Sequence, residues 1–290
     1  MAKILEGKQV VSVLNKKLRS DVNGLKSKGI TPTLAIVRVG EREDDIAYER
    51  SAAKRCETIG VTVKNFVLSG EASQDEVLSA IDMINKDDGI HGCLLFRPLP
   101  KHMDDNLIRN ALCPAKDVDG ITDSSLTGVF TGIPAGFPPC TPQACMEILD
   151  HFGIDTLGKK AVVIGRSLVV GKPAAMMLIQ KDATVTVCHT KTEDMPAVCR
   201  EADILIVAAG RAGIVGKEYL RPGQIVIDVG INVDENGKLC GDVNFHEAEA
   251  IVEGITPVPG GVGTVTTSVL IKHVVETAVQ QTGKKNKLRS

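Results

Sequence analysis

The stretch "AVVIGRSLVVGKPAAMML", residues 161–178, decides the fold of this chain. Its first four residues are apolar and predict a buried strand, whereas Gly171 opens a segment with helical spacing and Pro173 stands in its first turn. Backbone N–H groups at such a helix start, together with the helix dipole, bind phosphate oxygens. The spacing G-x-S-x-x-x-G, from Gly165 through Ser167 to Gly171, meets the general dinucleotide fingerprint only in part. A tight strand–helix turn that needs glycine for steric reasons is the structural alternative.

Strand and helix patterns alternate on both sides of this turn. The predicted strands are 33–40, 61–68, 92–96, 159–165, 184–189, 203–210 and 224–232. The predicted helices are 8–28, 45–60, 74–86, 104–112, 142–151, 172–180, 193–201 and 265–281. Alternation with short connections is typical of parallel sheets covered by helices. We therefore predict an α/β protein of two domains, an N-terminal parallel-sheet domain and a Rossmann-like domain.

Residues 113–141 interrupt this alternation. They are rich in Gly, Pro, Asp, Ser and Thr and show no long period. A stretch of this length without regular structure is usually functional in a compact protein, and it also marks the approach to a domain boundary. We predict an N-terminal catalytic domain of residues 1–145 plus 272–290, with a returning C-terminal helix, and a nucleotide-binding domain of residues 146–271.

The end of the second strand of the Rossmann-like domain indicates which nucleotide binds. NAD sites usually place Asp or Glu there, where the carboxylate holds the ribose 2′-hydroxyl. Here the sequence reads "CHTK" over 188–191, and the first carboxylate is Glu193. Arg166 in the turn, with Thr190 and Lys191 opposite, supplies two cations and a hydroxyl that suit a 2′-phosphate. The sequence therefore favours NADP over NAD.

Composition excludes several classes of partner. The chain has 290 residues, 43% of them hydrophobic, and a formal net charge of −2, which predicts no nucleic-acid partner. No apolar stretch reaches the roughly 18–20 residues of a membrane span, and the N-terminus lacks a signal-peptide pattern, so we predict a cytoplasmic protein. Eight cysteines stand singly, without a CxxC pair, which predicts reduced thiols and no structural metal. Scattered histidines are assigned to surfaces or loops, namely His91, His102, His151, His246 and His273.

Short motifs follow one another in order along nearly the whole chain. They are "PTLAIVRVG", a tyrosine-bearing helix ending "CETIG", "RPLPKH", "KDVDGIT", "PPCTP", "VIGRSLVVGKP", "ATVTVCHTKT", "VIDVGIN", "GDV" and "TPVPGGVGT". Together they resemble the methylenetetrahydrofolate dehydrogenase/cyclohydrolases. The resemblance implies folate bound in a cleft between two domains, NADP on the second domain, and usually a homodimer. It implies hydride transfer from the methylene bridge of 5,10-methylenetetrahydrofolate, and in many members hydrolysis of the methenyl product to 10-formyltetrahydrofolate.

The hydrolytic step of the family relies on two residues that this chain lacks. The resemblance implies a lysine four residues after the tyrosine and a glutamine two residues before the first proline of the PLP motif. Four residues after Tyr48 stands Ala52, and two residues before Pro98 stands Phe96. Residue counts from Tyr48 to Gly60 match the family without a gap, so an alignment shift does not explain the difference.

Neighbouring cations do not replace the missing lysine. At about 100° per residue, Lys54 points away from the tyrosine face, whereas Arg55 returns to it about 10 Å along the axis. A guanidinium stays protonated and does not shuttle protons. We therefore predict an NADP-dependent dehydrogenase whose cyclohydrolase activity is weak or absent. Two alternatives stay open, a fully bifunctional enzyme with an unrecognised base and a folate- or nucleotide-binding protein without turnover.

Further positions carry over from the resemblance one by one. The resemblance implies that Tyr48 lies beside the folate ring, with a structural role as the alternative, and that Asp119 pairs with pterin nitrogens. Lys116 and Asp117 are interpreted as loop-fixing groups. Phe96 is expected to pack against folate, and Arg97 to form a salt bridge at the pocket rim. The predicted substrate contacts are Tyr48, Phe96, Pro98, Leu99, Asp119, Gly260, Gly261 and Thr264, and Thr264 and Val265 stand where the family usually has proline then methionine. The predicted cofactor contacts are Gly165, Arg166, Ser167, Gly171, Thr190, Lys191 and Ile231.

Overall fold

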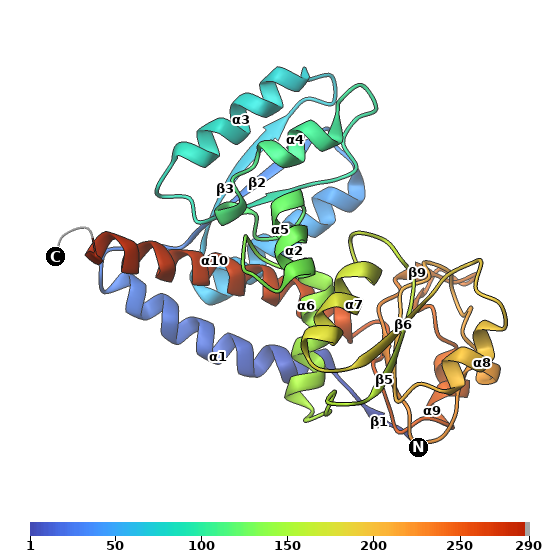
Figure 1. Ribbon diagram of the computed structural model, residues 1–290. Coiled ribbons are helices and arrows are strands. Elements are labelled where there is room, and N and C mark those ends of the chain that lie inside the picture. The colour runs from blue at the N-terminus through green and yellow to red at the C-terminus, as the bar shows by residue number, and fades with distance from the viewer. Residues whose placement is uncertain (288–290) are drawn as a thin grey trace. The chain divides into compact units, whose positions relative to one another are not determined.

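The computed structural model describes residues 1–287 and divides the chain into two compact units (Figure 1). The three-stranded unit comprises residues 13–138 and those from 267 onward, and the six-stranded unit comprises residues 1–12 and 139–266. Helices α1 (Gly7–Lys26) and α10 (Val262–Lys287) each contribute to both units. Each unit contains its own parallel sheet, which confirms the predicted two-domain α/β class.

The three-stranded unit is a parallel sheet in the order β3-β2-β4. Its strands are β2 (Thr33–Val39), β3 (Thr62–Leu68) and β4 (Gly92–Leu95). Every residue of β4 is buried, as expected for a strand covered on both faces. The helices between and after the strands are α2 (Glu43–Ile59), α3 (Gln74–Lys86) and α4 (Asp105–Ala111).

Helices α3 and α4 lie together over one face of this sheet (Figure 1). Alternate strand residues point toward them, and these are Ala35, Val37, Val39, Cys93 and Leu95. The apolar stripe of α3 repeats at helical spacing, so Val77, Ile81 and Ile84 fill the space against those strand residues. This packing fixes the end of β4, after which Phe96 and Arg97 follow.

The segment that the sequence predicted to be without regular structure, 113–141, contains helices. They are the short 3₁₀ helix η1 (Pro114–Lys116), α5 (Asp123–Thr131) and the first residues of α6 (Cys140–His151). The Thr122 hydroxyl accepts the Ser125 N–H at the start of α5, and Gly132 closes the helix with φ +72°. The prediction was wrong here because Ser, Thr and Gly within α5 conceal its helical period.

The six-stranded unit is a wholly parallel sheet in the order β1-β11-β8-β7-β5-β6. Its strands are β1 (Lys3–Ile4), β11 (Gly254–Ile255), β8 (Ile225–Asp228), β7 (Ile204–Val207), β5 (Lys160–Ile164) and β6 (Thr184–Cys188). The remaining elements are α7 (Gly171–Gln180), α8 (Met195–Arg200), η2 (Lys217–Tyr219), α9 (Phe245–Glu249) and a hairpin of β9 (Asn232–Val233) with β10 (Leu239–Cys240). The chain runs from β5 to β6 on one side and then to β7 on the other. In open α/β sheets, ligands bind outside the strand ends at such a reversal.

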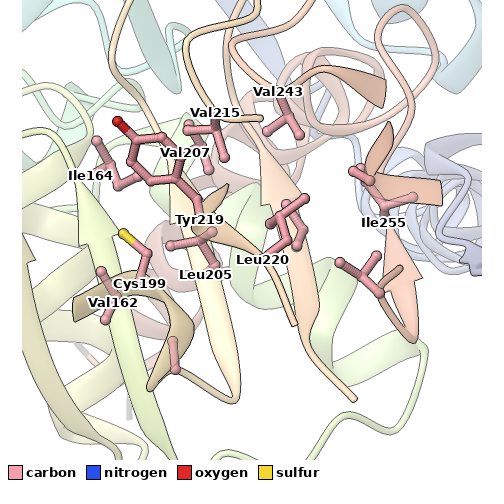
Figure 2. Close-up of a cluster of buried hydrophobic side chains, with 14 of the residues drawn as sticks. Val162, Ile164, Cys199, Leu205, Val207, Val215, Tyr219, Leu220, Val243 and Ile255 are labelled. Atoms are coloured by element: carbon pink, nitrogen blue, oxygen red, sulfur yellow. The ribbon is translucent and has the colours of Figure 1, made fainter. Parts of the chain in front are cut away.

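Apolar side chains beneath this reversal form one continuous cluster (Figure 2). Val162 of β5, Leu205 of β7 and Val226 of β8 contribute to it from neighbouring strands. Tyr219 and Leu220, from η2 and the residue after it, cover the cluster together with Cys199 of α8. The strands therefore pack against a continuous apolar cluster, which holds their carboxyl ends in fixed positions.

The limits of the units differ from the predicted ones at three places. Residues 1–12 belong to the six-stranded unit because β1 pairs with β11, with Lys3 opposite Gly254. Helix α6 also belongs to that unit, packs against α7, and moves the boundary from 145/146 to 138/139. The C-terminal return begins at residue 267 rather than 272, and residues 288–290 lie outside the described part of the chain.

One histidine contradicts its assignment to a surface or a loop. His273 lies within α10 and is 2% exposed, whereas His91 is 4% exposed but stands in the loop before β4. The eight cysteines are free, and six of them are buried. Within residues 1–287, no helix is long and apolar enough to cross a membrane, and no group of three or more His, Cys, Asp or Glu side chains is arranged to hold a metal ion.

Lys116 closes the carboxyl end of α3 from a distant part of the chain. Its ammonium donates to the carbonyls of Ile84, Asn85 and Asp87 at 2.6, 3.0 and 2.8 Å. The last carbonyls of a helix have no partner within the helix, and the helix dipole favours a cation beside them. The interpretation of Lys116 as a loop-fixing group is confirmed.

We expect Lys116→Met to lower the free energy of unfolding by about 1–3 kcal/mol, because the carbonyls lose a buried donor while the side-chain volume is kept. Denaturant unfolding measures this loss. Lys86→Met is the matched control, since Lys86 is exposed and pairs only at the surface with Asp82. That variant should differ from wild type by less than about 0.5 kcal/mol. Equal losses in both variants would contradict the role given to Lys116.

Candidate functional site

The turn after β5 is built so that only glycine fits at its two ends. Gly165 has φ +123°, and a Cβ on it would lie 2.4 Å from the Ala208 carbonyl oxygen at the end of β7. A Cβ on Gly171 would lie 2.1 Å from the Gly165 carbonyl oxygen. The start of α7 therefore folds back directly onto the end of β5, and this close approach leaves backbone N–H groups at the reversal of the sheet.

Ser167 shapes this turn from within. Its Oγ accepts hydrogen bonds from the Val170 N–H at 3.1 Å and the Gly171 N–H at 3.5 Å. The hydroxyl hydrogen is still able to donate to a ligand oxygen. Arg166 beside it is exposed, as are Leu168 and Val169.

The predicted 2′-phosphate donors stand at the ends of two paired strands. Ile164 of β5 is level with Cys188 of β6, so Arg166 and Thr190 each follow two residues beyond a paired position. The turn after β6 is ordered, because the Thr192 Oγ1 accepts the His189 N–H at 2.9 Å. Thr190 and Lys191 are exposed at this turn. Residues 188–192 contain no carboxylate, so the groups present fit a phosphate ester rather than a free 2′-hydroxyl.

A buried carboxylate holds the loop after β7. Asp242, which is 0% exposed, accepts backbone N–H groups from Ala209, Gly210 and Arg211 at 2.6, 2.8 and 2.9 Å. The Asn232 side chain donates to the same carboxylate at 2.9 Å. The loop that borders the reversal of the sheet is therefore fixed by one side chain.

A second buried carboxylate, Asp228, sits at the end of β8. It accepts backbone N–H groups from Gly230, Asp242 and Val243 at 2.9, 3.1 and 3.0 Å. Burial raises the pKa of Asp228 to about 6; the three N–H groups lower it, and the nearby Asp242 charge raises it. Neither aspartate was predicted from the sequence to have a role. The available signal was an acid at a strand end followed by glycine in "VIDVGIN", and an acid preceded by glycine in "GDV".

The predicted contacts from the glycine-rich motif also lie in the six-stranded unit. Gly260 has φ +104°, and its carbonyl accepts the Gly7 N–H at 2.8 Å. The Thr264 N–H donates to the Gly261 carbonyl at 3.1 Å. Ile231 is 67% exposed, and its Cδ1 would lie 3.4 Å from a Cβ on Gly263. The structure thus brings Ile231 beside this turn.

In the three-stranded unit, Tyr48 and Phe96 form an aromatic pair. Their ring centroids are 5.7 Å apart with planes at 85°, an edge-to-face contact. Phe96 is 9% exposed and Ala52, one helical turn after Tyr48, is 0% exposed. Lys54 is exposed. The surroundings of Tyr48 are consequently apolar and buried at the two positions where the family resemblance implies lysine and glutamine.

Asp119 lies in a turn that follows a residue bridged to β4. A parallel bridge joins Cys93 to Asp117, and the Gly120 N–H donates to the Asp117 carbonyl at 3.4 Å, so the chain turns at Val118 and Asp119. The fully buried Asp117 carboxylate accepts the Ile121 N–H, the Thr122 N–H and the Ser125 hydroxyl at 3.0, 2.8 and 2.7 Å. The interpretation of Asp117 as a loop-fixing group is confirmed.

The other residues after β4 have different surroundings. Arg97 forms a two-pronged ion pair with Asp105, with Nε 2.6 Å from Oδ1 and Nη2 against Oδ2, as its predicted salt bridge requires. Leu99 packs partly against the core beneath α3 and α4, so it also has a structural role. Pro98 is exposed.

Comparison with known proteins agrees with this arrangement. Residues 5–119 match the tetrahydrofolate dehydrogenase/cyclohydrolase catalytic domain, and residues 139–282 match the NAD(P)-binding domain of the same enzymes. This chain belongs to the tetrahydrofolate dehydrogenase/cyclohydrolase family. The predicted family, its oxidoreductase class and a nicotinamide-nucleotide domain are thereby confirmed.

Individual relatives cover almost the whole chain. The "Bifunctional protein FolD" of Carboxydothermus hydrogenoformans is 52% identical over 278 residues, which are 95% of this chain and 97% of that protein. The crystal structure of the bifunctional enzyme FolD from Campylobacter jejuni superposes with a TM-score of 0.94 at 40% identity, covering 97% of this chain and 99% of that one. FolD from Trypanosoma brucei, complexed with NADP cofactor and inhibitor, gives a TM-score of 0.90 at 32% identity and covers 100% of this chain and 99% of that one.

The raised pKa of Asp228 predicts a pH dependence of stability. Since the folded protein holds this proton more tightly than the unfolded chain, the contribution is fully present below about pH 4 and is lost as the pH rises through about 6. We expect the free energy of unfolding of wild type minus that of Asp228→Asn to fall by about 3 kcal/mol between about pH 4 and pH 7. Denaturant unfolding at each pH measures the difference.

Asp234→Asn is the control for this experiment. Asp234 also accepts backbone N–H groups, at 2.8 Å from both Asn236 and Lys238, but it lies in the β9–β10 turn rather than in the core. This variant should follow the wild-type pH profile. A difference between wild type and Asp228→Asn that stays constant or grows with pH would contradict the prediction.

Proposed function

We propose that this protein is an NADP-dependent 5,10-methylenetetrahydrofolate dehydrogenase with weak or absent cyclohydrolase activity. Family membership supports the dehydrogenase reaction. The observation that carries the loss of hydrolysis is the fully buried Ala52 beside the Tyr48–Phe96 pair, where the family resemblance implies an amine and an amide.

Hydride transfer depends on the relative position of the substrate and the nicotinamide more than on an acid or a base. The methylene carbon loses a hydride, and the positive charge that forms is shared by the two folate nitrogens that flank it. NADP⁺ supplies the hydride acceptor when it is bound. The residues proposed for the substrate align it, with Tyr48 and Phe96 against its rings and Asp119 accepting pterin N–H groups. Correct alignment of reactants is worth roughly 7–11 kcal/mol of the barrier.

Hydrolysis of the methenyl cation needs a group that moves protons. Water must add to the methenyl carbon and lose a proton, after which the ring carbon–nitrogen bond breaks. A well-placed acid or base accelerates such a step by roughly 10²–10⁴-fold. Among the described lysines, Lys116 is the buried one, and its ammonium is held by the three carbonyls at the end of α3. Lys54 is exposed, and an Arg55 guanidinium keeps its protons.

The full bifunctional reaction is the second candidate, since the relatives from Carboxydothermus hydrogenoformans and Campylobacter jejuni are named as bifunctional FolD proteins. One assay separates the two. The purified protein is given methylenetetrahydrofolate and NADP⁺, and methenyl product and NADPH are followed together by absorbance. We expect one methenyl product per NADPH. NADPH formed without methenyl accumulation, beyond spontaneous hydrolysis, would establish the second candidate instead.

Restoring the missing pair should restore hydrolysis. In the double variant Ala52→Lys with Phe96→Gln, we expect the enzymatic hydrolysis of methenyltetrahydrofolate to rise about tenfold or more above wild type, because a titratable amine and its amide partner are placed beside Tyr48. Each single variant is a matched control and should gain less. A double variant that keeps dehydrogenase activity and gains no hydrolysis would contradict the proposal.

The cofactor preference depends on Arg166 and Lys191. Removing either cation, as Arg166→Ala or Lys191→Ala, should raise the KM for NADP about tenfold and change the KM for NAD less than about twofold, because only the 2′-phosphate loses a charged partner. Lys181→Ala is the control, since Lys181 pairs with Asp150 at 2.6 Å. Equal effects on both cofactors would overturn the assignment.

A further inference from the structure

The loop that carries Asp119 is held on one side by Asp117 and on the other by a residue from the far end of the chain. Asp117 fixes residues 121–125 through its three hydrogen bonds. Gly120 follows Asp119 with φ +69°, which turns the chain immediately after the carboxylate. The Val118–Asp119 peptide between these points determines where the Asp119 side chain is directed.

Packing fixes the Val118 side chain. A Cβ on Gly92 would lie 2.6 Å from Val118 Cγ1 and 2.9 Å from Val274 Cγ2, so β4, the loop and α10 meet at a point where only glycine fits. Val118 is 0% exposed. The loop is therefore pressed between a strand and the C-terminal helix at the residue before Asp119.

His273 of α10 fixes the carbonyl of the same residue. Its Nδ1 lies 2.8 Å from the Val118 carbonyl oxygen, 155 residues away in the sequence. A carbonyl oxygen only accepts, so Nδ1 carries a proton and donates. The imidazole is stacked on Phe137 with ring centroids 4.4 Å apart and planes at 21°, and it is 2% exposed. Ring orientation and hydrogen-bond direction are thus both set.

We propose that His273 is a positioning residue for Asp119. The Val118 carbonyl belongs to the same rigid peptide plane as the Asp119 N–H, and this plane turns as one body. A donor fixed on the carbonyl therefore limits rotation about the bond that directs the Asp119 Cα–Cβ vector. A carboxylate that accepts two N–H bonds side by side depends strongly on its angle. This inference rests on the proposed function, in which Asp119 holds the pterin.

The test compares substitutions that keep or remove the donor. His273→Leu keeps the apolar volume without an N–H group, and His273→Asn places an amide N–H close to the position of Nδ1. We expect His273→Leu to raise the KM for methylenetetrahydrofolate and the Kd for tetrahydrofolate about tenfold, with the Kd for NADP within about twofold of wild type. His273→Asn should return both folate constants to within about threefold of wild type.

Thr277→Val is the matched control. Thr277 lies one turn further along α10, is 3% exposed, and its hydroxyl is 3.4 Å from the Ala115 carbonyl oxygen and 3.0 Å from that of His273. This variant loses a contact between α10 and η1 that does not involve Val118 or Asp119. It should leave the folate constants within about twofold of wild type.

A double-variant cycle separates positioning from packing. In an Asp119→Ala background, adding His273→Leu should cost less than about a further twofold in tetrahydrofolate affinity, because the group that His273 positions is already absent. A full additional tenfold loss would overturn the proposal, as would equal losses for folate and NADP or an Asn variant that behaves like Leu. If His273→Leu does not fold, His273→Asn and His273→Gln are compared, and equal folate constants in those two would overturn it.

Failure of the proposed function is distinguishable from failure of this inference. A wild-type protein that binds tetrahydrofolate but transfers no hydride would refute the proposed dehydrogenase activity. The affinity measurements on the variants would still test the positioning role of His273. A wild-type protein that turns over normally while the His273 variants affect both ligands alike would refute the positioning role alone.

Discussion

Buried carboxylates that accept backbone N–H groups hold irregular loops in both units. Asp117 holds the connection between η1 and α5, Asp228 holds the residues after β8, and Asp242 holds those after β7. A carboxylate removed from water is stable only when its oxygens are satisfied, and N–H groups of an irregular loop are stable in the core only with an acceptor. In these loops the N–H groups satisfy the carboxylate oxygens, and the carboxylate in turn satisfies the N–H groups. The loops therefore keep one conformation without belonging to a helix or a strand, and the residues that face ligands are presented from a fixed backbone.

Glycine also helps to fix the loop backbone at points where two segments of the chain approach closely. Gly165 against Ala208 and Gly92 against Val118 are points at which a Cβ would displace a neighbour. One lies beneath the nucleotide turn and the other beside the loop of Asp119. At both points the absence of a side chain lets a strand end and a neighbouring segment approach closely. Residues that we propose to bind ligands lie next to these points. The chemistry proposed for this protein, alignment of two ring systems for hydride transfer, requires this kind of rigidity more than it requires titratable groups.

The sequence predicted most of the helices and strands because their patterns are local. Helix α3 was predicted over 74–86 and occupies those residues, since its apolar period and its Ser73–Glu76 capping box both lie within the segment. β1 and β11 were missed because each has two residues, and only their pairing across the chain defines them. The residues of the candidate site also divide into those that a local pattern predicts and those that it does not. The turn residues from Gly165 to Gly171 follow from spacing, whereas Asp228, Asp242 and His273 act through partners that no local pattern identifies.

The two reactions of the family place different demands on a sequence. The residues that we propose for hydride transfer are many and come from both units, so this reaction is compatible with the substitutions that separate this chain from a relative at 52% identity. Hydrolysis depends, by the family resemblance, on one amine and the amide that orients it. Overall identity counts every position equally. It therefore reflects the many positions on which hydride transfer depends and not the two positions on which hydrolysis depends. In this chain an alanine methyl and a phenyl ring lie beside Tyr48, and neither takes up or releases a proton. For that reason our proposal of weak or absent hydrolysis rests on the local chemistry at Ala52 and Phe96 rather than on the bifunctional names of the relatives.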